Sequence, residues 1–356
     1  PHCIAYLYLF WICYFQTTKS GKMNLKKILS LAGLSLVFLV LILVALSVIS
    51  NMTKSLNSDY KLVATWKGTT PTSEQFTYPT GMKIYNEQIY VVDTNEHMIK
   101  VFDLDGVFIR QFGKKGLDKG EFNRPWNIFF SQDELYVAGY ENHRIDIFDP
   151  DGTYKRSFGS FGNGDGELNG PTAIAQDAND NFIVAELFGH RVSRFKSDGT
   201  FLSTWGQSGD GSRAIDSFKY PFDIATSPDK ELIYILDTAN ERVKVYDANG
   251  KYKFRWGGPF AYNTLIVWYK WFPFDGWFAD PKAITADTIG NIYVGDSGNK
   301  RVQVFDANGN HITSFGGTGE DEFSYIAGMD FSSDGSLYIV DESRRVVQKW
   351  QYQPNL

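Results

Sequence analysis

From about residue 60 to its end, the chain repeats one pattern, and this repeat constrains the fold more than any other feature. A Phe-Gly or Trp-Gly pair recurs with its glycine at positions 113, 159, 206, 257 and 316, so that successive units lie 46, 47, 51 and 59 residues apart. An Asp-x-x-Gly turn and an opening proline keep the same register, with Ile326 in place of the last proline. The opening prolines are Pro79, Pro125, Pro171, Pro221 and Pro281. Such a repeat indicates equal units that stack on one another.

Each unit contains four short runs rich in β-branched and aromatic residues, separated by turn residues. In the second unit the runs are Trp126–Phe130, Leu135–Gly139, Arg144–Asp149 and Thr153–Gly159. Four antiparallel strands in about 46 residues are typical of one blade of a propeller. The sequence therefore predicts an all-β, six-bladed β-propeller over residues 60–356.

The last unit lacks its outer strand. It supplies strands only around Gly328–Ser332, Ser336–Asp341 and Val346–Tyr352 before the sequence ends. The segment Leu62–Gly68 (LVATWKG) matches the outer-strand pattern FLSTWGQ and precedes the first unit. We therefore expect this N-terminal strand to complete the last blade, since an open ring would leave an exposed sheet edge.

Three stretches carry a resemblance to a known family: Pro171–Gly206, Pro281–Gly316 and Glu141–Gly152. They resemble the NHL-repeat family of six-bladed propellers, and the likeness extends over the chain from residue 60 onward. The resemblance implies the fold. It implies function only broadly, because propellers of this type include binding scaffolds, sensor domains and a few lyases.

Composition excludes some functions. The only cysteines are Cys3 and Cys13, too few for the RING and B-box zinc modules that accompany such propellers in animal ubiquitin ligases. Residues 1–50 hold four lysines and no acid, which leaves 31 basic against 41 acidic residues in the rest, a net charge of −10. An acidic body argues against nucleic acid as the partner.

The segment Ile28–Ile49 is a run of 22 uncharged, mostly aliphatic residues. As a helix it is about 33 Å long, enough to cross a hydrocarbon core of about 30 Å. Lys26 and Lys27 precede this run and only Lys54 closely follows it. The positive-inside rule then leaves the N-terminus in the cytoplasm and the propeller outside it.

We therefore expect a single-pass signal anchor over residues 23–50, followed by a linker over 51–59. The alternative is a cleaved signal peptide, which would make the propeller a secreted protein. Met23 begins a basic segment, MNLKK, that is typical of the start of a signal sequence. Residues 1–22 are interpreted as a mis-called upstream segment.

Three histidines, His97, His143 and His190, occupy the same repeat position, where the other units have Glu241, Lys300 and either Arg344 or Arg345. Zinc needs ligands at about 2 Å, whereas equivalent third-strand positions of adjacent blades lie about 10 Å outside the channel wall. We therefore expect hydrogen-bonded turn residues, with no metal and no cofactor. His311, at the start of an outer strand, is expected to be solvated.

A carboxylate ends the second strand of most units and is expected to cap a turn through backbone N–H groups. The residues are Asp93, Asp237, Asp296 and Asp341. The second and third units depart from this rule, with Gly139 and Glu186 in its place. A departure from the repeat favours a local purpose, so Glu186 is a candidate site residue.

The residue pair after each opening proline should lie at the mouth of the central channel. Most of these residues are small, but Trp126, Asn127, Phe222, Asp223 and Lys282 are not. Two aromatic rings, an amide, a carboxylate and an ammonium at one opening favour a polar organic ligand. The alternative is a plugged channel in which Asp223 pairs with Lys282.

One repeat is lengthened by an insertion, Pro259–Phe278, in which nine of twenty residues are aromatic. Exposed, it would form a large apolar patch, which monomers seldom tolerate. We expect either a lid packed on its own blades or a contact surface for a sugar, a protein or a lipid interface. Its candidate binding residues are Trp268, Tyr269, Trp271 and Trp277.

These features predict a membrane-anchored, extracytoplasmic propeller that acts as a binding, scaffold or sensor module for a protein, a glycan or a small polar ligand. No nucleophile–base pair stands out, so no catalytic residue is named. One alternative is a lyase or hydrolase at the mouth, resembling the amidating lyases or other propeller enzymes. In it, Asp223 or Glu186 acts as base and Lys282 stabilises an anion. A second alternative is a structural cell-surface protein.

Overall fold

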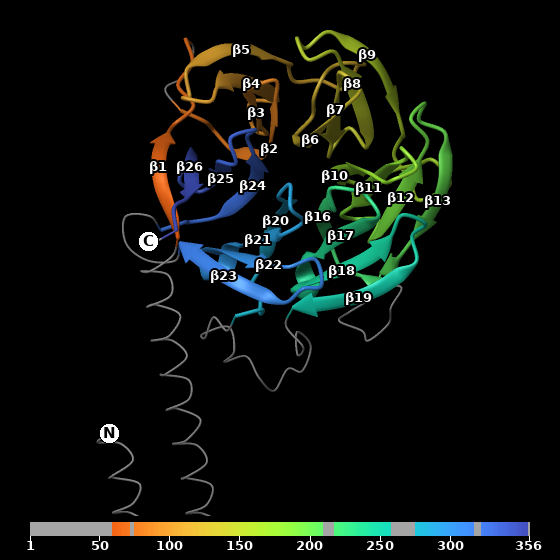
Figure 1. Cartoon of the computed structure of the whole chain (residues 1–356). Coiled ribbons are helices and arrows are strands. Elements are labelled where there is room, and N and C mark those ends of the chain that lie inside the picture. The colour runs from red at the N-terminus through yellow and green to blue at the C-terminus, as the bar shows by residue number, and fades with distance from the viewer. Residues whose placement is uncertain (1–58, 72–74, 209–216, 258–274, 317–321, 355–356) are drawn as a thin grey trace, which may run out of the picture. The chain divides into compact units, whose positions relative to one another are not determined.

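The computed structural model describes residues 59–71, 75–208, 217–257, 275–316 and 322–354. These residues form six four-stranded antiparallel sheets around a central axis (Figure 1). The first strand of each sheet lies innermost and contacts the first strands of both neighbouring sheets, which closes the ring. The prediction of a six-bladed β-propeller is thereby confirmed.

The strands follow the repeat in chain order. Blade 1 comprises β2 (Pro79–Tyr85), β3 (Gln88–Asp93), β4 (Met98–Asp103) and β5 (Phe108–Phe112). Blade 2 comprises β6 (Pro125–Ser131), β7 (Glu134–Gly139), β8 (Arg144–Phe148) and β9 (Tyr154–Phe158). Blade 3 comprises β10 (Pro171–Gln176), β11 (Phe182–Glu186), β12 (Arg191–Phe195) and β13 (Phe201–Trp205).

Blade 4 comprises β16 (Pro221–Thr226), β17 (Leu232–Asp237), β18 (Arg242–Asp247) and β19 (Tyr252–Gly257). Blade 5 comprises β20 (Pro281–Ala286), β21 (Ile292–Asp296), β22 (Arg301–Phe305) and β23 (His311–Gly316). Blade 6 comprises β24 (Ile326–Phe331), β25 (Leu337–Asp341), β26 (Val346–Tyr352) and β1 (Tyr60–Trp66). The short strands β14 (Gln207–Ser208) and β15 (Ser217–Phe218) pair in parallel, and the 3-10 turns η2 (Thr238–Asn240) and η4 (Ser297–Asn299) follow β17 and β21.

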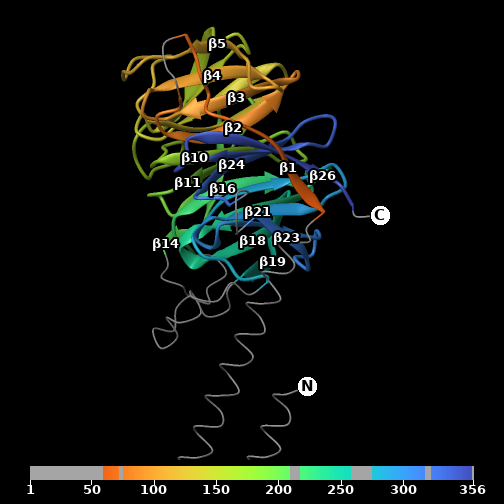
Figure 2. The ribbon, with the colours of Figure 1, turned by 90° about the vertical axis from the view of Figure 1, so that its left-hand side faces the viewer.

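The N-terminal strand β1 closes the ring as predicted. It pairs antiparallel with β26, with Leu62 opposite Trp350 and Trp66 opposite Val347, and Figure 2 shows the two strands side by side at the edge of blade 6. The Tyr60 ring also stacks on Phe315 of blade 5 with centroids 4.4 Å apart. The pairing removes the exposed edge that β26 would otherwise present.

The core is divided among the junctions between blades. Six clusters of buried apolar residues occur in the described part of the chain, each between two adjacent sheets. Between blades 6 and 1, for example, Met82 and Val91 pack with Tyr338 and Val340. A single four-stranded sheet has apolar residues on both faces, so each blade depends on its neighbours for burial.

Every inner strand has a register shift directly after its first residue. In blade 2, Pro125 lies opposite Gly139 but Asn127 lies opposite Ala138, so one residue, Trp126, is additional. The same shift follows the first residue of β2, β10, β16, β20 and β24. Such a bulge leaves its extra residue unpaired and re-aims its side chain, which places the residues after the proline at the end of the channel.

The Asp-x-x-Gly turns connect the third and fourth strands, and their glycines adopt φ of +80° to +99°. Each glycine faces the outer-strand aromatic residue of the preceding blade. A Cβ on Gly106 or on Gly309 would lie 2.7 Å from the ring of Trp66 or Trp256, respectively. Glycine is therefore needed for both its conformation and its close packing.

The predicted anchor lies outside the described residues. Among the residues that are described, no helix has the length and apolar character needed to span a membrane.

Candidate functional site

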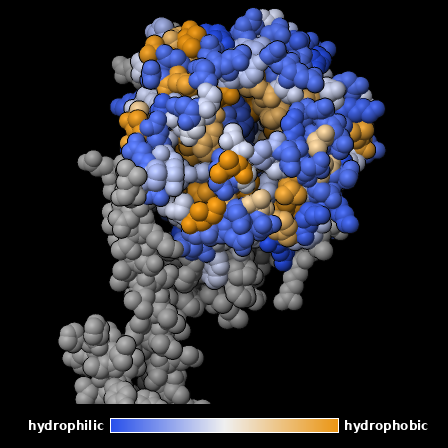
Figure 3. All heavy atoms as spheres, viewed as in Figure 1, coloured by the Kyte–Doolittle hydropathy of each residue, from blue (hydrophilic) through white to orange (hydrophobic). Residues whose placement is uncertain are grey.

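The strand directions define one face, which we call the mouth. Inner strands begin there, and the turns between second and third strands and the segments joining successive blades lie there too. The side chains at the mouth thus come from all six blades. Figure 3 looks onto the opposite face, where β26 ends, and shows a hollow near the axis of the ring with apolar residues around it.

The carboxylates that end the second strands hold the segments that lead into their own blades. Asp237 is fully buried; its Oδ1 accepts the Lys219 N–H at 2.7 Å, and its Oδ2 accepts Arg242 Nε at 2.7 Å. Backbone N–H groups of the corresponding segments likewise bind Asp93, Asp296 and Asp341. The predicted acceptor role is present, but the main donors belong to the entry segment rather than to the following turn.

Glu186 follows this same structural pattern. It is fully buried, and Oε1 accepts bonds from Arg191 Nε at 2.8 Å and Ser193 Oγ at 2.5 Å. Oε2 accepts the Asn169 N–H at 2.8 Å. Burial raises the pKa of this carboxyl. Both oxygens of Glu186 are thus engaged within the protein, and the binding or basic role expected for this residue stays a prediction.

Blade 2 replaces the missing carboxylate with a neighbouring amide. Asn142 Oδ1 accepts the Asn123 N–H at 2.5 Å, which satisfies the donor that an aspartate satisfies elsewhere. A Cβ on Gly139 would lie 3.0 Å from the Asn142 side chain. The glycine therefore leaves room for this substitute.

A short hydroxyl follows the carboxylate in three blades and links each to the next blade. Thr94, Thr238 and Ser297 donate to the carbonyl oxygens of the next opening residues, Pro125, Pro281 and Ile326, at 2.7–2.8 Å. The other three blades have Tyr140, Leu187 and Glu342 at this position. Tyr140 and Glu342 are functional candidates that the sequence reasoning missed, although this break in the repeat marks them.

An aromatic wall lines the mouth from blades 1, 2 and 4. The Trp126 ring lies 5.0 Å from Tyr140 and, nearly perpendicular, 5.6 Å from Phe222. Tyr78, in the segment that enters blade 1, lies 6.4 Å from Trp126 on the other side. Trp126 is half-buried, so part of this residue is accessible to solvent.

Charged groups meet this wall from blades 5 and 6. Lys282 Nζ lies 4.3 Å from the Phe222 ring centroid and 3.3 Å from Asp280 Oδ1. Glu342 hydrogen-bonds the Tyr78 hydroxyl, and burial together with the Glu342 charge raises the pKa of Tyr78 to about 12. Burial also raises the pKa of Glu342. We call Tyr78, Trp126, Tyr140, Phe222, Lys282 and Glu342 the mouth cluster.

Asn127 and Asp223 lie next to this cluster and bind each other. Asn127 Nδ2 donates to Asp223 Oδ1 at 3.2 Å, and the N–H groups of Ile224 and Ile284 donate to the carboxylate at 2.9 Å each. Burial raises the pKa of Asp223 to about 6. The alternative of an Asp223–Lys282 pair is not what forms, because Lys282 contacts Asp280 and Phe222 instead.

This geometry bears on the enzyme alternative. Both oxygens of Asp223 accept backbone N–H groups, and the residue is only 8% exposed. A general base needs a lone pair within reach of the substrate proton. Asp223 and Glu186, the two bases considered, are both buried and each already accepts three hydrogen bonds from within the protein.

At the opposite end of the inner strands, a cavity of about 460 Å³ lies between the ends of β2 and β6. Tyr85 stacks on Phe130 there with ring centroids 4.2 Å apart. Lys83 Nζ lies 3.1 Å from Asp330 Oδ1, inside the channel end. None of the residues predicted for the site lies in this cavity.

The candidates in the aromatic insertion are only partly placed. Trp268, Tyr269 and Trp271 lie outside the described residues. Trp277 is half-buried, and its carbonyl oxygen accepts Gln303 Nε2 at 2.7 Å, which ties this segment to blade 5. The choice between a lid and a contact surface therefore stays a prediction.

The three histidines are turn residues that link blades. Each has a left-handed backbone, with φ of 51–57°, as do Glu241, Lys300 and Arg345 at the equivalent positions. The Nδ1 atoms accept the N–H of the residue before the next opening proline at 3.0–3.2 Å; the pairs are His97–Arg124, His143–Gly170 and His190–Tyr220. His311 is half-buried rather than solvated, with Nε2 2.8 Å from Ser314 Oγ.

No group of three or more histidine, cysteine, aspartate or glutamate side chains is placed to hold a metal ion within the described ranges. The carboxylates there are instead occupied by arginine, lysine and backbone donors.

Comparisons with known proteins place the fold. Residues 278–305, which cover the first three strands of blade 5, match the model of the NHL repeat. Among curated proteins, none matches the sequence.

Solved structures match over most of the chain at low identity. Virginiamycin B lyase from Staphylococcus aureus is 16% identical, with a TM-score of 0.56, over 82% of this chain and 99% of that one. A gluconolactonase from Xanthomonas campestris is 15% identical, with a TM-score of 0.55, over 78% and 86%. An auxiliary nutrient binding protein from Bacteroides thetaiotaomicron is 13% identical, with a TM-score of 0.58, over 78% and 70%. These likenesses show a shared fold that serves enzymes and binding proteins alike, and the chain is a six-bladed β-propeller with an NHL repeat in its fifth blade.

Proposed function

We propose that this protein is a ligand-binding propeller whose mouth cluster holds a small organic molecule that carries a flat ring and a polar group. One observation supports this most: aromatic rings from three blades, of which Tyr78, Trp126 and Tyr140 are partly exposed, meet Lys282, Asp280 and Glu342 from two other blades at a single opening. The ring would pack on Trp126, Tyr140 and Phe222, and the polar group would face the charged side chains.

The chemistry of the cluster favours such a ligand over a purely structural role. A mouth that serves only stability gains most from small or aliphatic side chains, as at Thr172 and Ala327 in the same position of blades 3 and 6. Aromatic rings with polar tips, beside a few oriented charges, are typical of small-molecule sites. The rings also contact one another, which limits the conformational entropy lost on binding.

We further propose that an N-terminal membrane helix, residues 23–50, holds the propeller outside the cytoplasm. The uncharged run of 22 residues and the lysines before it support this topology. Ligands at the mouth would then come from the extracytoplasmic space. A cleaved segment would give a secreted protein with the same site.

The test titrates the full chain with two ring probes of opposite charge, tryptamine and indole-3-acetate, and follows the heat of binding. At least one probe should bind, and Trp126→Thr should weaken it about tenfold or more, since a ring contact is lost. Threonine occupies this position in blades 1 and 3, so the variant keeps a residue that the repeat tolerates.

Trp66→Phe is the control, because Trp66 lies on the outermost strand of blade 6 and not on an inner strand. It should leave the affinity unchanged. If neither probe binds, or if both tryptophan variants weaken binding equally, the mouth is not the site.

A further inference from the structure

The charges at the mouth are unequal, and their balance bears on which ligand the mouth cluster suits. Asp280 and Glu342 are both bound by one residue, Tyr325. Its hydroxyl donates to Asp280 Oδ2 at 2.8 Å, and its carbonyl oxygen accepts the Glu342 N–H at 2.9 Å. The Asp280 side chain is 51% exposed. Two acidic residues thus lie together on one side of the opening, and one of them is open to solvent.

Lys282 offsets only part of this negative charge. Its ammonium lies 3.3 Å from Asp280 Oδ1. Burial is the main reason that the pKa of Glu342 is raised. The charge of Lys282 lowers that pKa, whereas the charges of Asp341 and Asp280 raise it further. Among the described groups, three carboxylates here therefore share one ammonium.

Arg124 does not offset this excess of negative charge. Its guanidinium lies 3.4 Å from Glu141 Oε1, and both side chains are partly exposed, so these two charges largely cancel. A carboxylate has about four lone-pair sites, so Asp280 can accept donors beyond Lys282 and Tyr325. The acidic side of the mouth therefore has the capacity to bind another positively charged donor.

The aromatic wall favours the same sign of charge. The face of an aromatic ring carries partial negative charge and attracts cations. The protein itself contains such a contact, because Lys282 Nζ lies 4.3 Å from the centroid of the Phe222 ring. Trp126 and Tyr140, with centroids 5.0 Å apart, are both partly exposed. A ligand that carries a cation next to its own ring would therefore meet favourable contacts at both ends.

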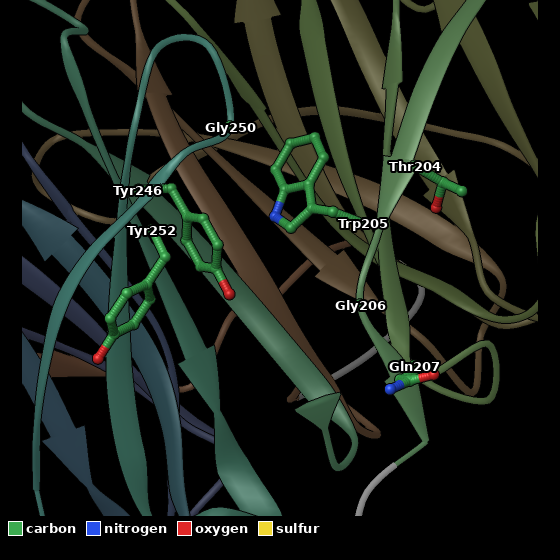
Figure 4. Close-up of a pocket in the computed structure, with 7 residues that line it drawn as sticks. All are labelled: Thr204, Trp205, Gly206, Gln207, Tyr246, Gly250 and Tyr252. Carbon is green, nitrogen blue, oxygen red and sulfur yellow. The ribbon is translucent and has the colours of Figure 1, made fainter. Parts of the chain in front are cut away.

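A second aromatic cavity provides a comparison. Trp205, Tyr246 and Tyr252 lie together in a cavity of about 350 Å³ between blades 3 and 4 (Figure 4). The rings of Trp205 and Tyr246 have centroids 6.0 Å apart. None of the described residues that line this cavity is charged, and the Thr204 hydroxyl already donates to the Val192 carbonyl oxygen at 3.0 Å. This cavity has aromatic area but no counter-charge in its lining for an ammonium, so it serves as an internal control.

We propose that the mouth cluster binds an organic cation, an amine whose ring packs on Trp126 and Tyr140 and whose ammonium lies beside Asp280 and Glu342. The inference rests on the binding function proposed above and adds the sign of the ligand's charge. A ligand carboxylate would face the same two carboxylates, at a cost in affinity. An ammonium would instead form charge-assisted hydrogen bonds, which are about twice as strong as neutral ones.

The test compares three indole probes whose side groups differ in charge: tryptamine, neutral indole-3-ethanol and indole-3-acetate. Calorimetric titration of the full chain at neutral pH and low salt gives each dissociation constant. Tryptamine should bind about tenfold more tightly than indole-3-ethanol, and indole-3-acetate should bind more weakly than either. The preference for tryptamine should shrink in high salt, because partly exposed charges are screened.

Two variants each remove one negative charge and keep the shape of the side chain. Glu342→Gln retains an oxygen that accepts the Tyr78 hydroxyl. Asp280→Asn retains a residue that tolerates the left-handed backbone at this position, where φ is 47°. Each should weaken tryptamine binding about tenfold and leave indole-3-ethanol binding unchanged, which a loss of folding would not do. Lys282→Met removes a like charge and should strengthen tryptamine binding severalfold, whereas a site for anions would show the opposite change.

Two control variants should leave tryptamine binding unchanged. Glu231→Gln is the matched control for charge, because it removes the same charge from an exposed turn at the opposite end of blade 4. Trp205→Phe tests the uncharged cavity, and phenylalanine occupies the equivalent position in blades 1 and 2.

Three results would overturn this inference: binding of indole-3-ethanol or indole-3-acetate as tight as that of tryptamine, equal losses in Glu231→Gln and Glu342→Gln, or weaker tryptamine binding in Lys282→Met. In the first case, binding that depends on Trp126 would still support the proposed function. If none of the three probes binds, the proposed function itself is wrong, and the inference fails with it.

Discussion

His143 links blade 2 to blade 3, and replacing it with lysine isolates that contact. Its Nδ1 accepts the Gly170 N–H at 3.1 Å, whereas a lysine ammonium has no lone pair to accept a bond. The backbone should tolerate the change, because Lys300 holds the equivalent place with φ of 55° against 54° for His143. The substitution therefore tests the hydrogen bond rather than the turn.

The size of the effect follows from the burial of the contact. A neutral hydrogen bond contributes about 0.5–1.5 kcal/mol to the free energy of unfolding. Because this bond is only half-buried, we expect a value in the lower part of that range, about 0.5–1 kcal/mol. His97 and His190 make the same bond at other junctions, so a triple lysine variant should lose about 1.5–3 kcal/mol by additivity. Its melting temperature should fall by several degrees.

The pH dependence supplies the sharper readout. Burial lowers the pKa of His97 and His143, and Lys115 and Arg124 lower that of His97 further while Glu141 opposes them. The unfolded histidine takes up its proton near its ordinary value of 6.5 and the folded one at lower pH. Acidification through this window therefore favours unfolding, and the stabilisation is complete only above it.

Thermal unfolding of the full chain, followed by circular dichroism at about pH 8 and pH 5, measures both effects. At pH 8 the wild-type chain should melt at a higher temperature than the lysine variant. At pH 5 this difference in melting temperature should be smaller, because protonated wild-type histidines can no longer accept the backbone N–H groups. Equal melting temperatures at pH 8 would refute the role of the bonds. If the difference in melting temperature between wild type and variant is as large at pH 5 as at pH 8, the argument that histidine protonation breaks these bonds is refuted.

Three more outcomes are expected. The Asp223 carboxyl should titrate near pH 6 in carbon-13 NMR; because its folded pKa is raised, its contribution to stability grows as the pH falls through that range, and a midpoint near 4 would contradict the burial argument. Asp237→Asn removes the carboxylate charge that pairs with the buried Arg242 and should cost about 3–5 kcal/mol in denaturant unfolding, whereas a loss below about 1 kcal/mol would mean that this pair is dispensable. Tyr60→Ala removes the stacking on Phe315 and a 2.6 Å hydroxyl contact with Tyr293, so the variant should lose about 2–4 kcal/mol and expose β1 to proteases; an unchanged cleavage pattern would show that the closure holds without it.

The repeat pattern in the sequence predicted only some of the residues at the mouth. The position after each opening proline correctly predicted that Trp126, Phe222 and Lys282 converge, because a bulge there is a local property of every inner strand. Tyr78 was missed because it precedes a proline rather than follows one. Tyr140 and Glu342 replace a hydroxyl that links blades elsewhere, a signal that becomes meaningful only when the link is seen.

Glu186 shows why a departure from the repeat is ambiguous. A glutamate in an aspartate position is consistent with a new function or with the same function at a longer reach. The register of β11 and β12 sets Glu186 opposite Arg191, which favours the same structural role as the aspartates, carried out by a longer side chain. That pairing depends on the fold of the whole blade, and the sequence does not contain the direction of the side chain.

The sequence by itself determined the number of blades, their strand order and the closure of β1 on β26, because these depend on patterns within about fifty residues and on glycines and prolines with fixed backbone demands. The tertiary structure alone decided which side chains meet across the axis and which junction is loose. Trp205, Trp66 and Trp256 are the same residue in the same pattern, yet a Cβ on the facing glycine would lie 3.7 Å from the Trp205 ring and 2.7 Å from the other two rings, and Trp205 borders a cavity. A difference of about 1 Å between two packed sheets results from the balance of all their contacts, and no single position in the sequence encodes it.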